Sequence, residues 1–341
     1  MNLADFDYEL PPELIAQAPP ESRDASRLLI LRRATRQLED RAFSDLPSLL
    51  RAGDCLVVND SRVIPARVLA EDDAGRAVEL LFVEPLSEHA WRALVRPGRR
   101  CKPGAQLRAG GVRLRVVGSD PDGARVIARE HGTIAALLDA HGLPPLPPYI
   151  ARHAKPAPED WERYQTVYAA APGSVAAPTA GLHFTTAMLD ALRAASIETH
   201  AVTLHVGPAT FRPVTASTVE AHRMPPERAS VSDATARAIN RAGEEGRRVI
   251  AVGTTTVRTL ESVADDSGRV RAFDGVADIT IRPGHRFRVI DALVTNFHLP
   301  RSSLLLLVAA FAGRDLVLHA YHHAVAARYR FCSYGDAMLI V

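Results

Sequence analysis

The chain has 341 residues, of which 47% are hydrophobic and 23% are charged, and its formal net charge is +2. These values are ordinary for a soluble globular protein of one large or two ordinary domains, and they exclude a globally basic nucleic-acid-binding protein. The longest apolar run, residues 304–312, is too short to span a membrane. The acidic first five residues contain no signal-peptide core, so we expect a cytoplasmic protein.

The first half of the chain changes pattern at about residue 63. Before it, a short helix is predicted at 13–18, and strands are predicted at 28–31 and 54–58. After it, short β-like runs are separated by turn residues, and a helix pattern closes the series. The runs cover residues 77–83, 91–95, 106–107, 112–117 and 124–128, and the helix covers 132–141. Regular short strands broken by glycine and proline are typical of a small barrel or sandwich.

Four prolines within residues 144–148 indicate a boundary, because proline fits neither a helix interior nor a central strand. Beyond it, helices and strands alternate. Helices are predicted at 186–195, 233–245 (capped by Ser232), 257–264, 302–312 and 314–328, and strands at 197–204, 248–252 and 289–295. This alternation predicts an α/β fold. We expect a mixed α/β core domain of residues 1–62 and 148–341, with a small all-β barrel domain of residues 63–147 inserted into it.

One histidine lies in a stretch of low charge that is rich in small residues, 175–185. It is His183, which stands between a Pro-Thr-Ala-Gly turn and the predicted helix at 186–195. Thr185 or Thr186 is the expected cap of that helix. A turn that leads into a helix N-terminus offers free backbone N–H groups and a positive dipole end, which suit an anionic ligand. The alternative is an ordinary loop before a helix.

Four further polar turns share this character, and each follows or closes a predicted strand. They are residues 59–67, 203–211, 249–258 and 295–300. Ligands of open α/β sheets bind at the carboxyl ends of the strands. Together with 175–185, these turns therefore predict one shared ligand cleft. The alternative is a chance set of unrelated loops.

The sequence offers little support for a metal site or for a common nucleotide-binding motif. No His-Glu-x-x-His or Cys-x-x-Cys spacing is present, and neither a Walker motif nor a Gly-x-Gly-x-x-Gly turn occurs. One helix face carries a histidine cluster, which either binds a metal or, more commonly, is a solvated surface; its members are His319, His322 and His323. The histidines of the polar turns are each either structural or catalytic: His183, His205 and His298.

The stretch 91–116 holds eight cationic residues and no acidic one. Such a local concentration on a small β domain predicts a phosphate-binding face. The alternative is a solvated basic edge that protects the strands from pairing. The cationic residues are Arg92, Arg96, Arg99, Arg100, Lys102, Arg108, Arg113 and Arg115.

Taken together, these segments resemble the S-adenosylmethionine:tRNA ribosyltransferase-isomerase family of queuosine biosynthesis. The similarity runs through nearly the whole chain in the family's order, and its motifs are long and specific. The matching segments are residues 5–11, 23–29, 59–67, 164–169, 177–185, 253–261, 295–300 and 329–340.

The resemblance implies an enzyme that moves the ribosyl part of S-adenosylmethionine onto the 7-aminomethyl-7-deazaguanine at the tRNA wobble position. The sugar is isomerised to an epoxycyclopentane, giving epoxyqueuosine, adenine and methionine. S-adenosylmethionine is then a cosubstrate, and no metal is required. The sulfonium acidifies the C5′ hydrogens of the ribose, so a histidine is the natural general base. We expect a monomer that binds tRNA and S-adenosylmethionine and contacts no membrane.

The resemblance also suggests roles for the residues of the polar turns. His183 or His205 is the expected base, and His298 is expected to face the adenine or the ribose hydroxyls. Arg258 is expected to hold the methionine carboxylate, unless it only pairs with Glu261. The other expected S-adenosylmethionine contacts are Thr179, Gly181, Gly253, Thr254, Thr255 and Asn296. The expected contacts to the sugar or the tRNA nucleotide are Asp60, Ser61 and Arg62. The anticodon arm is expected on the basic β domain, through Arg99 and Arg100, and on the histidine-rich helix.

Two places depart from the family pattern. The family usually has Gly-x-Gly-Thr-Phe after His-Val, whereas this chain has alanine at the second glycine, Ala209. The family usually has Met-His-x-Glu, whereas Met224 is followed here by Pro225, with Glu227 retained. A methyl group on residue 209 crowds a close backbone approach and disfavours a positive φ. Two other hypotheses stay open: a non-catalytic or altered-substrate RNA-binding relative, and an S-adenosylmethionine-dependent RNA methyltransferase, although the glycine-rich loop typical of such methyltransferases is not found.

Overall fold

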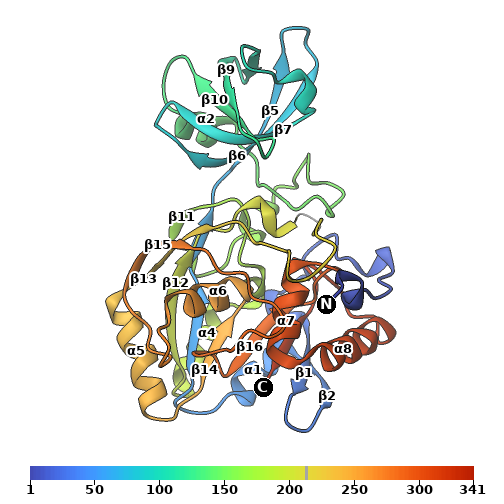
Figure 1. The fold of residues 1–341 in the computed structure, drawn as a ribbon, viewed down its shortest axis with the longest axis vertical. Coiled ribbons are helices and arrows are strands. Elements are labelled where there is room, and N and C mark those ends of the chain that lie inside the picture. Colours follow the sequence, from blue (N-terminus) through green and yellow to red (C-terminus); the bar gives the residue numbers. More distant parts are fainter. Residues whose placement is uncertain (212–213) are drawn as a thin grey trace.

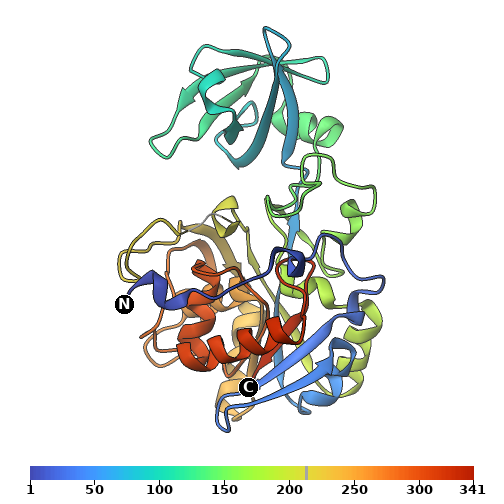
Figure 2. The same ribbon diagram turned by 90° about the vertical axis from the view of Figure 1, so that its right-hand side faces the viewer.

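The computed structural model describes residues 1–211 and 214–341. They form a nine-stranded mixed sheet with helices on both faces, and a closed six-stranded barrel that stands at one end of the molecule (Figures 1 and 2). The predicted fold class, a mixed α/β core with an inserted β-barrel, is confirmed. The division into domains at residues 62/63 and 147/148 stays a prediction.

The large sheet is parallel at its centre. In sheet order its strands are β15 (Phe273–Ala277), β13 (Glu227–Val231), β12 (Glu198–Leu204), β3 (Cys55–Asn59), β14 (Val249–Val252), β16 (Ala292–Asn296), β17 (Ala337–Ile340), β1 (Arg27–Arg32) and β2 (Gln37–Ala42). Strands β12, β3, β14 and β16 run parallel, whereas β17 is antiparallel to β16 and parallel to β1. The carboxyl ends of the four parallel strands therefore meet at one edge, where the predicted polar turns begin.

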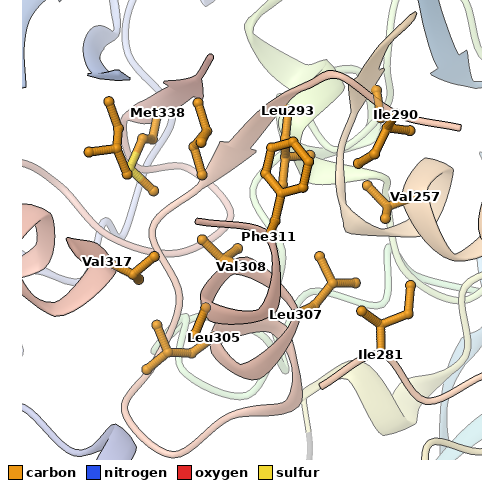
Figure 3. Packing of buried hydrophobic residues seen from close by; sticks show 14 of the residues in the cluster. Val257, Ile281, Ile290, Leu293, Leu305, Leu307, Val308, Phe311, Val317 and Met338 are labelled. Carbon is orange, nitrogen blue, oxygen red and sulfur yellow. The ribbon is translucent and has the colours of Figure 1, made fainter. Parts of the chain in front are cut away.

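Both faces of the central strands are buried, which explains their continuous apolar sequences. In β3, Cys55 and Val57 belong to one core, and Leu56 and Val58 to the other. The first and larger core lies under α5 (Asp233–Glu244), α6 (Thr254–Val263), α7 (Ser303–Ala312) and α8 (Arg314–Ala326); Figure 3 shows part of it. The second core lies under α1 (Leu46–Leu49) and α4 (Thr186–Ala194).

The barrel is made entirely of antiparallel neighbours around its own apolar core. Its strands are β5 (Arg67–Asp72), β6 (Ala77–Pro85), β7 (Ala90–Arg96), β8 (Gln106–Ala109), β9 (Val112–Ser119) and β10 (Arg125–Arg129), and α2 (Ile134–His141) packs against them. The chain enters after β4 (Ser61–Val63), which pairs with β11 (Ala171–Ser174). It leaves through the prolines at 144–148 and reaches α3 (Asp160–Arg163).

Several local predictions are confirmed, and some are wrong. Ser232 and Thr185 cap α5 and α4 by accepting a backbone N–H. The helix expected at 13–18 is a 3₁₀ turn, Pro12–Leu14, because the next residues pair with the distant segment at Phe331. The helix expected at 257–264 already begins at Thr254. Strands β2, β4, β5, β11, β13, β15 and β17 were not predicted; β17 is a short continuous apolar run that could have been read as a buried strand, whereas the others are short and mixed in polarity.

No single helix in the described ranges is long and apolar enough to cross a membrane. Helices α7 and α8 meet that criterion of length and composition only when they are taken together, and they are bent by 116°.

Candidate active site

A cavity of about 140 Å³ opens at the carboxyl edge of the parallel strands. Six of the residues predicted to bind ligand or act on it line this cavity: Thr179, Gly253, Thr254, Thr255, Asn296 and His298. Val206 and Thr210 also line it, so four of the five predicted polar turns meet there. The remaining turn, 59–67, reaches this region through β3: the Asn59 side chain donates to the hydroxyl of Thr255 at 3.1 Å.

The N-terminus of α6 lies at the cavity wall. Its cap is Gly253, whose φ of +88° is a conformation that glycine adopts without strain. Gly253 has no side chain to cap the first turn, so the turn's N–H groups remain open to a ligand. Thr254 and Thr255 continue the wall. A helix N-terminus of this kind favours an anion through its aligned N–H groups and positive dipole end.

A hydrogen-bonded series of side chains runs from the protein interior to the cavity. The Asn296 Nδ2 lies 3.0 Å from His183 Nε2 and also reaches the carbonyls of Cys332 and Asp336. Because those carbonyls only accept, this atom is the amide nitrogen, and His183 Nε2 accepts from it. The other ring nitrogen of His183, Nδ1, therefore carries the proton and donates to Ser26 Oγ at 2.9 Å. On the cavity side, Thr179 Oγ1 donates to Asn296 Oδ1 at 2.9 Å.

His183 is thus a buried neutral imidazole with both ring nitrogens engaged. It does not line the cavity, and its ring packs on Phe43. Burial, helped by the positive charges of Arg330 and Arg23, lowers the pKa of His183 from 6.5 to about 3. The geometry orients Asn296 and leaves no lone pair of His183 facing a ligand.

This environment predicts a specific dependence of stability on pH. The unfolded chain protonates His183 near pH 6.5, whereas the folded chain keeps it neutral down to about pH 3. The contribution of the neutral His183 to the free energy of unfolding is complete above pH 6.5 and is lost as the pH falls from there towards 3. Between pH 6 and 4, we expect the free energy of unfolding of His183→Gln to fall less steeply than that of the wild type, by about 1.4 kcal/mol per pH unit. Urea unfolding at several pH values measures both slopes, and equal slopes would contradict the assignment.

His298 lines the cavity itself. Its Nε2 lies 2.9 Å from Thr295 Oγ1, while Nδ1 has no hydrogen-bond partner among the described residues. Burial lowers the pKa of His298 from 6.5 to about 3. Its backbone is held by the hydroxyls of Tyr321 and Tyr8. His298 is therefore a neutral, fixed imidazole with one nitrogen available to a ligand.

His205 follows β12 and directly precedes Val206 of the cavity wall. Its Nδ1 is buried and has no hydrogen-bond partner among residues 1–211 and 214–341. A buried nitrogen without a partner is uncommon in native structures. Burial, followed by the charge of Arg228, lowers the pKa of His205, and the nearby Asp60 opposes this shift. His205 is only half-buried.

Arg258 does not reach the cavity. It is 3% exposed and forms an ion pair with Glu227, which is 7% exposed. Its remaining donors go to the carbonyls of Pro225 and Ile279, and the expected pairing with Glu261 does not form. Glu227 also accepts the N–H of Gly207 at 2.7 Å. The ion pair therefore fixes the segment that follows His205.

The residues expected at the sugar or the tRNA nucleotide do not line this cavity. Asp60 accepts from Thr203 Oγ1 at 2.7 Å, and Ser61 is buried and accepts from Ser174 Oγ at 2.8 Å. Arg62 is exposed. Gly181 packs so closely under Tyr168 that an added Cβ would lie 2.0 Å from the phenol oxygen. Gly181 therefore has a packing role in this structure, outside the cavity wall.

The chain matches the family model described as queuosine biosynthesis protein over residues 3–340. The chain belongs to this family. The S-adenosylmethionine:tRNA ribosyltransferase-isomerase of Symbiobacterium thermophilum is 52% identical over 345 residues, covering 100% of both chains. The one from Anaeromyxobacter sp. is 54% identical, covering 100% of this chain and 99% of its own. The crystal structure of S-adenosylmethionine tRNA ribosyltransferase from Thermotoga maritima is similar at 39% identity, with a TM-score of 0.57, and the match covers 99% of this chain and 100% of that one. The resemblance inferred from the motifs is confirmed.

Of the two departures from the family pattern, Pro225 contacts the ion pair of Arg258. The side chain of Ala209 lies outside the described part of the structure, and its backbone belongs to a 3₁₀ turn, Pro208–Phe211. Pro225 offers its carbonyl to Arg258 at 3.2 Å, and the retained family residue Glu227 carries the buried carboxylate.

The cavity also contains polar residues that the sequence did not single out: Tyr149, Thr295, Arg301 and Ser333. Thr295 and Ser333 lie inside family motifs that were recognised in the sequence, so those motifs could have pointed to both residues. Tyr149 follows the proline segment and contacts the hydroxyl of Ser333, a pairing between residues 184 positions apart. Such a contact is set by the fold and leaves no local pattern.

The cationic stretch of the barrel is partly neutralised by carboxylates from other segments. Arg92 pairs with Glu84, Asp120 and Asp122, and Arg113 pairs with Glu130. Arg99 is exposed and Arg100 half-buried. In the histidine cluster, His323 pairs with Asp40, whereas His319 and His322 are exposed. Within the described ranges, no group of three or more His, Cys, Asp or Glu residues is arranged to hold a metal, and the absence of a metal requirement stays a prediction.

Proposed function

We propose that this protein transfers and isomerises the ribosyl moiety of S-adenosylmethionine onto 7-aminomethyl-7-deazaguanine at the tRNA wobble position, giving epoxyqueuosine-tRNA, adenine and methionine. The full-length similarity to relatives that bear this enzyme name carries the proposal. The cavity at the carboxyl edge of the sheet supports it, since this is the edge where α/β proteins bind ligands. The proposed partners are tRNA and S-adenosylmethionine, and we expect a cytoplasmic monomer.

In this proposal S-adenosylmethionine occupies the cavity. Its methionine carboxylate lies at the first turn of α6, where Gly253 leaves the N–H groups open. Arg258 is excluded from that contact because its donors are already engaged. Asn296 and Thr179 meet the ribose hydroxyls, and the apolar wall around Val206 and Leu304 receives the sulfonium region. Bound in this way, the substrate keeps its C5′ hydrogens beside the segment at 205–210.

The three histidines take different parts in the proposed reaction. His205 removes the C5′ proton: it does not line the cavity itself, but it directly precedes Val206 of the cavity wall, its half-buried ring packs against Gly173 and has a buried nitrogen without a partner among the described residues, and it lies near the charge of Asp60. His298 is neutral and offers Nδ1 as a hydrogen-bonding group to the adenine or a ribose hydroxyl. His183 is a positioning residue that orients the amide of Asn296.

The tRNA is expected to contact the barrel through its exposed cations. Replacing Arg99 and Arg100 together by alanine should weaken tRNA binding and reduce the steepness of its salt dependence, by up to one released counterion per lost phosphate contact. Binding at several salt concentrations measures both effects. Arg193→Ala is a matched control, because this exposed arginine lies on α4 of the α/β core and, among the described residues, forms an ion pair with Asp190 alone. An unchanged salt slope in the double variant would remove this surface from the interface.

The deciding experiment is adenine release from S-adenosylmethionine, with and without tRNA that carries the aminomethyl base, followed by mass analysis of the modified nucleoside. Adenine release that depends on tRNA, together with an epoxyqueuosine mass, supports the proposal. Methylated tRNA with S-adenosylhomocysteine would indicate a methyltransferase instead. Tight tRNA binding without adenine would indicate a relative that has lost or changed its chemistry.

A further inference from the structure

A second cavity, of about 340 Å³, lies between the barrel and the core. Barrel strands β6 and β7 form one wall, and the proline-rich segment 145–148 forms another. Val175 and Pro208 of the core complete it. The cavity is therefore built from three parts of the chain that are distant in sequence.

This second cavity is a direct neighbour of the first one. Val175 and Pro208 line the second cavity, whereas Ala177 and Val206 line the first. The two segments are joined by a hydrogen bond from the Val175 N–H to the Val206 carbonyl, at 2.9 Å. The cavities thus lie against the same pair of segments, and their lining residues there are two positions apart in each segment. A ligand in one is within short reach of a ligand in the other.

The polar groups of the second cavity are held in place by a buried arginine. Arg67 is 4% exposed, and it donates to Glu79 Oε1 at 2.9 Å and to the Leu146 carbonyl at 2.8 Å. Its Nε is buried and has no hydrogen-bond partner among the described residues. An unpartnered buried donor in a cavity wall is costly unless a ligand or water satisfies it.

Two further groups are available to a ligand. Glu79 Oε2 has no hydrogen-bond partner within the described ranges, and the side chain is 24% exposed. Arg96 stands directly across from Glu79 on the neighbouring strand, and it is exposed without an ion pair to any described residue. The site therefore offers a carboxylate oxygen of Glu79 and the guanidinium of Arg96 next to apolar walls of proline, leucine and valine. Asp122 and His153 also line it, and the Asp122 carboxylate is paired with Arg92. This combination matches a nucleotide: a flat base with N–H donors on its edge, and a phosphate.

We propose that the second cavity binds the tRNA nucleotide that accepts the ribosyl group, with the aminomethyl ammonium of its base on Glu79 and a phosphate on Arg96. This rests on the proposed function. The 7-aminomethyl-7-deazaguanine base carries an unusual number of donors: a ring N–H, an exocyclic amino group and an aminomethyl ammonium. The carboxylate of Glu79, which Arg67 holds in place, selects such a base, and the apolar walls cover the faces of the base. The aminomethyl nitrogen then lies beside the cavity assigned to S-adenosylmethionine.

The test compares binding of two tRNAs that differ only at the wobble base, one with the aminomethyl-deazaguanine and one with guanine. We expect Glu79→Gln to reduce the preference for the modified tRNA about tenfold or more, since a charge-assisted contact to the ammonium is lost. Arg96→Ala should weaken the binding of both tRNAs to the same extent. Glu84→Gln is the matched control on the same strand, because Glu84 faces Arg92 and does not line the cavity. The preference of this control variant for the modified tRNA should be unchanged.

Glu79→Gln also weakens the pairing with the buried Arg67, so a second variant is needed to separate a loss of tRNA binding from a loss of folding. Leu94→Trp fills the cavity from an apolar wall and keeps the pair of Arg67 and Glu79 intact. Melting temperature and S-adenosylmethionine binding should stay unchanged in Leu94→Trp, while its affinity for the modified tRNA falls. Unchanged preference in Glu79→Gln and unchanged affinity in Leu94→Trp would overturn the inference, even if the wild type releases adenine. If the wild type releases no adenine but Glu79→Gln still loses the preference, the proposed function fails and the binding site stands.

Discussion

Replacing His205 by alanine is expected to lower the rate of tRNA-dependent adenine release by about a hundredfold or more. The variant removes the ring proposed to take the C5′ proton, while the ion pair of Arg258 with Glu227 still holds the following segment through Gly207. Burial lowers the pKa of His205 below its ordinary value of 6.5. The acidic limb of kcat/KM in the wild type should therefore lie below pH 6.5, and it should disappear in the variant. Steady-state kinetics from pH 5 to 8 measure both effects.

His200→Ala is the matched control for this experiment. His200 lies on β12, the strand that precedes His205, where it contacts Glu198, and it does not line the cavity. Its removal should leave the rate and the pH profile unchanged. Near-normal adenine release by His205→Ala, with an intact acidic limb, would transfer the proton abstraction to another group, with His298 as the next candidate because it keeps one open nitrogen.

Replacing Arg258 by alanine is expected to lower the free energy of unfolding by about 3–5 kcal/mol, because it leaves the carboxylate of Glu227 buried without its partner. The carbonyls of Pro225 and Ile279 lose a donor as well. Chemical denaturation at pH 7 measures the loss. The same variant should also slow adenine release, since the ion pair positions the segment after His205.

A double variant separates the buried charge from the lost contacts. In Arg258→Met with Glu227→Gln, neither charge of this pair remains, and the glutamine still accepts the N–H of Gly207. Replacing a buried ion pair by neutral groups of similar size is much less costly than breaking it, so we expect the double variant to recover most of the stability. A double variant as unstable as Arg258→Ala would show that the ion pair itself is not the source of the effect.

Much of the core was predictable because its signals are local. Strands β3 and β14 are continuous apolar runs, and such runs form strands that are buried on both faces. The capping residues Thr185 and Ser232 were read from their positions before periodic segments. The clustering of Gly253, Thr254, Asn296 and His298 around one cavity was expected from a general rule, since parallel strands end at the same edge.

The sequence by itself determined the fold class, the family and the edge of the sheet where the polar turns gather, because each of these follows from local patterns and from their order along the chain. Only the tertiary structure decided the state of the individual side chains. His183 has both nitrogens engaged by Ser26 and Asn296, which are 157 and 113 residues away in the chain. Arg258, on helix α6, finds its partner Glu227 on strand β13, 31 residues away, and no local spacing predicts that contact. Burial and hydrogen bonding depend on which segments pack together. They decide whether a histidine can take a proton or only orients a neighbouring side chain.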